Sequence, residues 1–86
     1  MKKILFYDNK NVISKQLKLA RIKCELSQAD LAAKMQTMNV SIDQQMISKI
    51  ENNARVVTDY ELACFCKILN VSEQELLRDF YENYNQ

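Results

Sequence analysis

Two glutamines and a lysine, Gln44, Gln45 and Lys49, lie close together in a short stretch that mixes polar and apolar residues. A glutamine carboxamide donates and accepts hydrogen bonds at the same time, a pattern that suits the N6/N7 edge of adenine in the major groove of DNA. Lys49 follows Gln45 by one helical turn, and from that face it can reach guanine O6/N7 or a phosphate, while Ser48 flanks it. The alternative interpretation is that these polar side chains only solvate a helix.

The chain of 86 residues lacks side chains on which many enzymes depend. It contains no His, which excludes Ser-His-Asp and Cys-His nucleophile systems and zinc sites built from Cys and His. It contains no Gly, which argues against phosphate-binding and dinucleotide-binding loops. A chain of this length supports one modest core without a large enclosed cavity. We therefore predict a single domain that is not an enzyme, needs no cofactor or metal, and presents a surface to a partner.

The cysteines do not form a recognisable metal or redox motif. Cys24 stands alone, and the spacing of Cys64 and Cys66 differs from CxxC. We predict reduced, mostly buried thiols, with a redox sensor as the alternative. The apolar run from Ile4 to Tyr7 is too short for a signal peptide or a membrane span, which favours a cytoplasmic location.

The net charge of +1 hides an asymmetry along the chain. Residues 1–55 carry ten basic and five acidic side chains, a net +5, whereas residues 56–86 carry two basic and six acidic ones, a net −4. This split predicts a basic part that meets phosphates and an acidic part that turns away from them. Uneven charge without functional meaning, which is common in small helical domains, is the alternative.

Helix start signals recur along the chain, and the apolar residues between them are three and four apart, which predicts an all-α domain of five helices. The expected caps are Asn11, Ser27 and Asp43, together with the capping boxes Thr58–Glu61 and Ser72–Glu75. The expected helices are Val12 to Cys24, Gln28 to Met38, Gln44 to Asn52, Asp59 to Leu69 and Glu73 to Tyr84. The expected inward-facing residues are Ile13, Leu17, Ala20, Cys24, Leu31, Ala32, Met35, Met38, Met46, Ile47, Ile50, Leu62, Phe65, Leu69, Leu76, Leu77, Phe80 and Tyr84.

Asparagines stand at the expected helix ends in this chain without glycine. Among residues other than Gly, Asn best tolerates the left-handed backbone that ends a helix. Asn39, Asn53 and Asn70 each stand where the apolar pattern breaks. Only Lys3 to Tyr7 favours extended structure, within an N-terminal arm of residues 1–10 that precedes a domain of residues 11–86.

The segment from Ser27 to Asn53 has the arrangement of a helix-turn-helix unit. Ala32 is small, so that a second helix can cross close by, while Val40 in the turn and Ile47 fill the angle between the helices. With LKLARIK, LSQADLAAKM, MISKIENN and TDYELACFCKILNVSEQELL, the chain resembles the lambda-repressor-like family of the Cro or Xre type over most of its length. The connection between the second and third helices is longer than is usual in that family, which we expect to change the angle at which the third helix is presented.

The resemblance implies a transcriptional regulator, with a repressor favoured, that binds a double-stranded DNA operator through the major groove. Base contacts are expected from Gln44, Gln45, Ser48 and Lys49, and phosphate contacts from Ser27, Gln28, Asn52 and Arg55. Arg21 and Glu51 occupy positions that form a structural ion pair in that family. Lys2, Lys3 and Lys10 either extend the phosphate contacts or only increase solubility.

The resemblance, the symmetry of operators and the small size of one DNA-binding module imply a homodimer, and an apolar stripe near the C-terminus is its expected interface. Phe80, Tyr81 and Tyr84 continue this stripe past the point where a small core should be full, and the alternative is that their helix closes its own core. A second hypothesis for the whole chain is a protein-binding module, such as the antitoxin of a toxin–antitoxin pair, whose acidic C-terminal half binds a partner protein.

Overall fold

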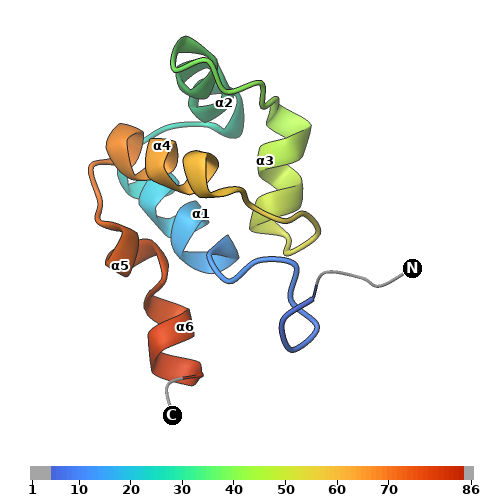
Figure 1. The fold of residues 1–86 in the computed structure, drawn as a ribbon. Coiled ribbons are helices and arrows are strands. Elements are labelled where there is room, and N and C mark those ends of the chain that lie inside the picture. Colours follow the sequence, from blue (N-terminus) through green and yellow to red (C-terminus); the bar gives the residue numbers. More distant parts are fainter. Residues whose placement is uncertain (1–4, 85–86) are drawn as a thin grey trace.

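The computed structural model describes residues 5–84, which form six helices and no named strand (Figure 1). The helices are α1 (Ser14–Lys23), α2 (Gln28–Thr37), α3 (Gln44–Glu51), α4 (Asp59–Leu69), α5 (Glu73–Leu76) and α6 (Arg78–Asn83). The predicted all-α fold is confirmed, and the first four helices lie within two residues of their predicted bounds.

Three helices begin with a capping box, in which a hydroxyl accepts from a backbone N–H and a carboxylate accepts from the cap's own N–H. These pairs are Ser27–Asp30 at α2, Thr58–Glu61 at α4 and Ser72–Glu75 at α5. The last two boxes are confirmed as predicted. Asp30 completes the first with a shorter side chain than the usual Glu, a member that the sequence pattern did not identify.

The prediction that Asn11 caps the first helix is wrong. The helix begins at Ser14, and its cap, Ile13, makes no side-chain hydrogen bond. Asn11 Oδ1 accepts from the backbone N–H of Ile13 at 3.0 Å, while its amide nitrogen donates to the carbonyls of Ile50 and Arg55. The side chain is held toward the loop after α3, so it does not reach the free amides of α1.

Asparagine ends three helices, as predicted. Asn39, Asn53 and Asn70 have φ values of 64°, 58° and 55°, in the left-handed region that terminates a helix. Glu25 adopts the same conformation after α1, with φ 59°, although its side chain gives no signal for it.

The predicted fifth helix, Glu73 to Tyr84, is divided at Leu77. The backbone there has φ −90° and ψ 11°, which departs from α-helical values and separates α5 from α6. Leu76 is buried, and Leu77 also packs against the core from a half-buried position. The bend lets both leucines face the core while α6 extends toward the N-terminal segment, where Phe80 contacts Phe6.

The core lies among α1, α2, α3, α4 and α5. Ile42, in the connection before α3, is buried although the sequence pattern did not mark it as an inward residue. Cys24 was predicted to face inward, but this prediction is wrong: Cys24 is exposed at the C-terminal end of α1. The buried apolar residues are Ile13, Leu17, Leu31, Ala32, Met35, Val40, Ile42, Ile47, Ile50, Phe65, Cys66, Leu69 and Leu76.

The three cysteines have free thiols and differ in their surroundings. Cys66 is buried, Cys64 is half-buried and Cys24 is exposed, so the prediction of buried thiols is wrong for Cys24. Burial raises the pKa of the Cys66 thiol to about 11, and the nearby Glu73 carboxylate adds to the shift.

The N-terminal segment folds back as a tight turn. Phe6 and Asn9 exchange two backbone hydrogen bonds of 2.8 Å, and Tyr7 and Asp8 between them have left-handed backbone. The extended structure predicted up to Tyr7 is therefore wrong for the residues that the structure describes.

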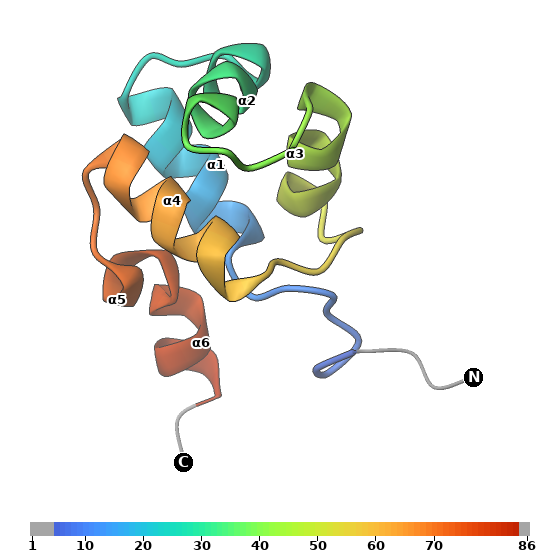
Figure 2. The ribbon, with the colours of Figure 1, turned by 45° about the horizontal axis from the view of Figure 1, so that its top comes forward.

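Helix α3 stands at one edge of the molecule, and α6 extends from another side (Figures 1 and 2). Helix α3 packs on α1 and α2, while α6 is joined to the rest of the chain through α5. This arrangement leaves one face of α3 open.

Candidate nucleic-acid interface

The exposed face of α3 carries the polar residues predicted to contact bases. Gln44, Gln45 and Lys49 are exposed, and Ser48 is half-buried. On the opposite face, Ile47 and Ile50 are fully buried, at 0% exposure each, and Met46 is half-buried. Because the isoleucines lock the rotation of the helix, the glutamines and the lysine must point to solvent.

The N-terminal end of α3 is fixed by its cap and by the preceding connection. Asp43 Oδ1 accepts from the backbone N–H of Met46 at 2.8 Å, as its predicted role as a cap requires. Gln36 Nε2 donates to the carbonyl of Ile42 at 3.0 Å, and both Ile42 and Val40 are buried. The connection after α2 is thus anchored directly before the cap.

The C-terminal end of α3 is joined to α1 by a bidentate ion pair. Arg21 Nε lies 2.7 Å from Glu51 Oε2, and Arg21 Nη2 donates to Oε1 at 3.0 Å. Arg21 Nη1 also donates to the carbonyl of Leu26. The hydrogen bonds to Glu51 raise the pKa of Arg21 against the opposing effect of burial. This pair orients α3 with respect to α1 and to the start of α2.

Gln28, a predicted phosphate contact, joins the same cluster. Its Nε2 donates to Glu51 Oε1 at 3.1 Å, which leaves one further amide N–H for another acceptor. Ser27 Oγ accepts from the backbone N–H of Asp30, so its hydroxyl proton is available as a donor. The Asp30 carboxylate bonds to the N–H of Ser27, which lowers the pKa of Asp30 and places a negative charge at the start of α2. A phosphate bound there would meet that charge.

Arg55, in the loop after α3, is held by a buried carboxylate. Its Nη1 and Nη2 donate to the two oxygens of Glu61 at 2.9 and 3.0 Å, and Nη1 also donates to the carbonyl of Val56. These hydrogen bonds raise the pKa of Arg55. Burial opposes ionisation of Glu61, but hydrogen bonds from Arg55 and Thr58 outweigh it and lower the pKa of Glu61.

The pair with Glu61 does not use all the donors of Arg55. Among residues 5–84, its Nε–H and the second N–H of Nη2 have no hydrogen-bond partner, and 25% of the side chain is exposed. These two N–H groups lie on the same side of the guanidinium and form a fork that matches two phosphate oxygens. Arg55 can therefore keep its contact with Glu61 while it binds a phosphate.

Two further predicted phosphate contacts, Asn52 and Lys10, are exposed. Asn52 is exposed at the end of α3, and its amide lies 3.4 Å from Ser48 Oγ. The backbone N–H of Lys10 donates to Asn53 in the turn after α3. Lys2 and Lys3 lie outside the described residues.

The residues predicted for a dimer interface pack partly against their own chain. The ring of Tyr84 stacks on Tyr7 at 5.1 Å and meets Phe6 edge-on at 4.9 Å, and Phe80 lies 5.6 Å from Phe6. Tyr81 remains 49% exposed. The structure brings Phe80 and Tyr84 together with the N-terminal turn and leaves Tyr81 on the surface.

Sequence reasoning did not identify two residues that position this surface. Glu61 was assigned only as half of a capping box, and Asn11 only as a helix cap. Their contacts with Arg55 join segments that no local pattern connects.

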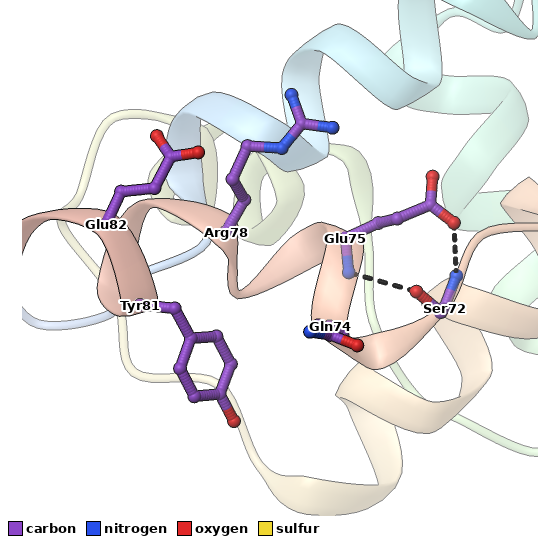
Figure 3. Close-up of a pocket in the computed structure, with 6 residues that line it drawn as sticks. All are labelled: Ser72, Gln74, Glu75, Arg78, Tyr81 and Glu82. Carbon is purple, nitrogen blue, oxygen red and sulfur yellow. Dashed lines mark hydrogen bonds between the residues drawn. The ribbon is translucent and has the colours of Figure 1, made fainter. Parts of the chain in front are cut away.

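A shallow hollow lies apart from the exposed face of α3. The hollow in Figure 3 lies along α5 and α6, away from α3, and has a volume of about 250 Å³. Its walls include Arg78, Tyr81 and Glu82, together with the capping pair Ser72 and Glu75. Residues 5–84 contain no group of three or more His, Cys, Asp or Glu side chains placed to hold a metal ion. None of the helices described here has both the length and the apolar character needed to cross a membrane.

Comparison with protein families identifies this arrangement. The helix-turn-helix family matches residues 17–76, which is more than half of the chain and includes α2, α3 and α4. A comparison with curated proteins finds no match. The resemblance noted in the sequence is thereby confirmed, and this chain belongs to the helix-turn-helix family of the Xre and lambda-repressor-like type, a family that suggests a DNA-binding regulator.

Proposed function

We propose that this protein is a sequence-specific regulator that binds double-stranded DNA as a dimer, places α3 in the major groove and represses transcription. The observation that carries the proposal is the presentation of α3. Its inner face is locked by Ile47 and Ile50, and its C-terminal end is tied to α1 through Glu51 and Arg21. A rigid helix with a free polar face is what direct reading of bases requires.

Gln44 and Gln45 are the proposed base contacts at the start of α3. Both side chains are exposed, so their amides are available to adenine edges. Lys49 lies one turn further along and would reach a guanine or a phosphate. Ser48 is half-buried and would make a flanking contact.

Phosphate contacts on both sides of α3 would fix its register on the duplex. Ser27 and Gln28 at the start of α2 would form one side, and Asn52 and Arg55 the other. Arg55 has the stronger support, because among residues 5–84 its Nε–H and the second N–H of Nη2 have no partner and can bind two phosphate oxygens. Asp30 weakens the case for Ser27.

A homodimer is part of the proposal, because one module contacts too few bases to discriminate among genomic sites. The proposed contact is the aromatic surface formed by Phe80, Tyr81 and Tyr84, with Tyr81 as its most exposed member. Packing of Phe80 and Tyr84 against Phe6 would give that surface a fixed shape.

The test is binding of the purified chain to duplexes selected from random-sequence DNA, followed by fluorescence anisotropy at several salt concentrations. The proposal predicts recovery of a defined sequence motif and an affinity that falls steeply with salt, because phosphate contacts release counterions. Failure to enrich any sequence, or an affinity independent of salt, would contradict it. Poor solubility of the chain that is relieved only by a co-expressed neighbouring protein would instead favour the antitoxin hypothesis.

A further inference from the structure

The side chain of Asn11 bridges the two ends of the loop that follows α3. Its Nδ2 donates to the carbonyl of Ile50 at 3.0 Å and to the carbonyl of Arg55 at 2.9 Å. Ile50 belongs to the last turn of α3, and Arg55 lies beyond the turn formed around Asn53. One amide group therefore fixes the separation between the end of α3 and the backbone of Arg55.

The loop returns the contact through Asn53. Its Oδ1 accepts from the backbone N–H groups of Lys10 and Asn11 at 2.9 and 3.2 Å. Its Nδ2 donates to Asn9 Oδ1 at 2.7 Å. The N-terminal segment and the loop thus hold each other through reciprocal side-chain bonds, in a region that is partly shielded from water.

The chemistry of both positions requires an amide. Asn11 uses two donors of one nitrogen on two carbonyls, and also accepts at Oδ1 from Ile13, so a carboxylate or a hydroxyl at this position could not supply the same set. Asn53 combines an acceptor and a donor with left-handed backbone at φ 58°. A stop for α3 alone would need only the backbone conformation.

Arg55 is consequently held at both ends. Asn11 binds its carbonyl, and Glu61 binds its guanidinium. We infer that Asn11, supported by Asn53, is a positioning residue that sets Arg55 for its phosphate contact; this inference rests on the proposed function. It gives the N-terminal segment a part in shaping the DNA-binding surface, although neither Asn11 nor Asn53 contacts the DNA.

A double-mutant cycle on a duplex selected by the wild-type chain tests the inference. Asn11→Ala is expected to weaken binding about tenfold for all sequences, on the scale of the two hydrogen bonds it removes. It is also expected to reduce the slope of log affinity against log salt concentration by about one, the change that loss of one phosphate contact gives. Arg55→Ala should reduce the slope by the same amount. In the Arg55→Ala background, Asn11→Ala should change affinity less than about twofold, because the contact it positions is already absent.

Two further variants separate positioning from general stability. Gln16→Ala removes an amide hydrogen bond to Asp79, between α1 and α6, and should leave affinity within about twofold of the wild type. Asn53→Gly keeps the left-handed turn but removes the side-chain bonds, and should reproduce the effect of Asn11→Ala. Hydrogen exchange of the Ala54 amide, which donates to the Lys49 carbonyl at 2.7 Å, should accelerate in both loop variants and not in Gln16→Ala.

The outcomes are distinguishable. Equal losses from Asn11→Ala in both backgrounds, or no loss in either, would overturn the inference while the proposed function stands. A wild-type chain that binds no duplex would overturn the proposed function and this inference with it. Unchanged exchange at Ala54 in Asn11→Ala would show that the hydrogen bonds of Asn11 do not hold the loop after α3. That result would overturn the inference whatever the DNA result.

Discussion

Arg55 and Glu61 form a bidentate pair in which the carboxylate is buried and the guanidinium keeps one edge toward solvent. Glu61 Oε1, which accepts from Arg55 Nη1, also accepts from the backbone N–H of Thr58, so one carboxylate caps α4 and holds the loop after α3. The pair links the stability of the fold to the shape of the proposed DNA-binding surface.

Glu61→Gln should destabilise the protein by about 1–3 kcal/mol, because Arg55 loses its charged partner and one acceptor becomes a donor. The matched control is Glu75→Gln, which alters the exposed capping box with Ser72 and should cost less than about 1 kcal/mol. Urea unfolding of the two variants at neutral pH measures the difference. Equal costs would show that Glu61 acts only as a cap.

The stability that Glu61 contributes should depend on pH. The pKa of Glu61 in the folded protein is lower than in the unfolded chain, where a Glu has a pKa of about 4.3. The contribution is therefore fully present above that unfolded value and is lost as the pH falls through the lower folded value. The difference in unfolding free energy between wild type and Glu61→Gln should stay constant at neutral pH and shrink as the pH falls below about 4.3. A difference that stays constant or grows on acidification would contradict the assignment.

Alkylation should distinguish the three cysteines. Cys24 is exposed and should react first with iodoacetamide at a pH of about 8, whereas Cys66 should resist because it is buried and its pKa is raised to about 11. Mass spectrometry of timed samples follows each site, and unfolding in urea supplies the control in which all three become accessible. Labelling of Cys66 as fast as Cys24 in the folded chain would show that the packing of α4 against the core does not shield it.

Tyr81→Ser should weaken self-association. Tyr81 is exposed next to Phe80 on α6, and its removal takes apolar area from the proposed contact between copies. Tyr60→Ser is the control, because Tyr60 is 59% exposed on α4, outside that surface. Sedimentation equilibrium is expected to show a dissociation constant raised about tenfold for Tyr81→Ser only. A monomeric wild type would refute the dimer.

Local signals predicted the helix boundaries well, because each depends on residues close in sequence. The boxes at Thr58 and Ser72 and the asparagine stops at Asn39 and Asn70 act within a few residues of the helix that they limit. Glu25 shows the limit of that rule, since it adopts the same left-handed backbone without a favourable side chain.

Contacts between distant segments were the part that the sequence did not reveal. Asn11 bonds to the carbonyl of Arg55, 44 positions away, and therefore does not cap α1. The break at Leu77 follows from how α5 and α6 meet the core and the N-terminal turn, which a continuous apolar stripe does not show. The Arg21–Glu51 contact was expected only from the family resemblance, because nothing in its spacing of 30 positions implies it.

The central claim is that α3 reads bases through Gln44 and Gln45, and selection from random-sequence DNA by wild type, Gln45→Ala and the double variant Gln44→Ala/Gln45→Ala tests it most directly. We expect Gln45→Ala to relax preference at one base position by about 1–3 kcal/mol, and the double variant to lose preference at the positions that α3 contacts. Arg55→Ala should retain the same motif with weaker binding to every sequence. A double variant that selects the wild-type motif with undiminished specificity would contradict the assignment of α3 as the recognition helix.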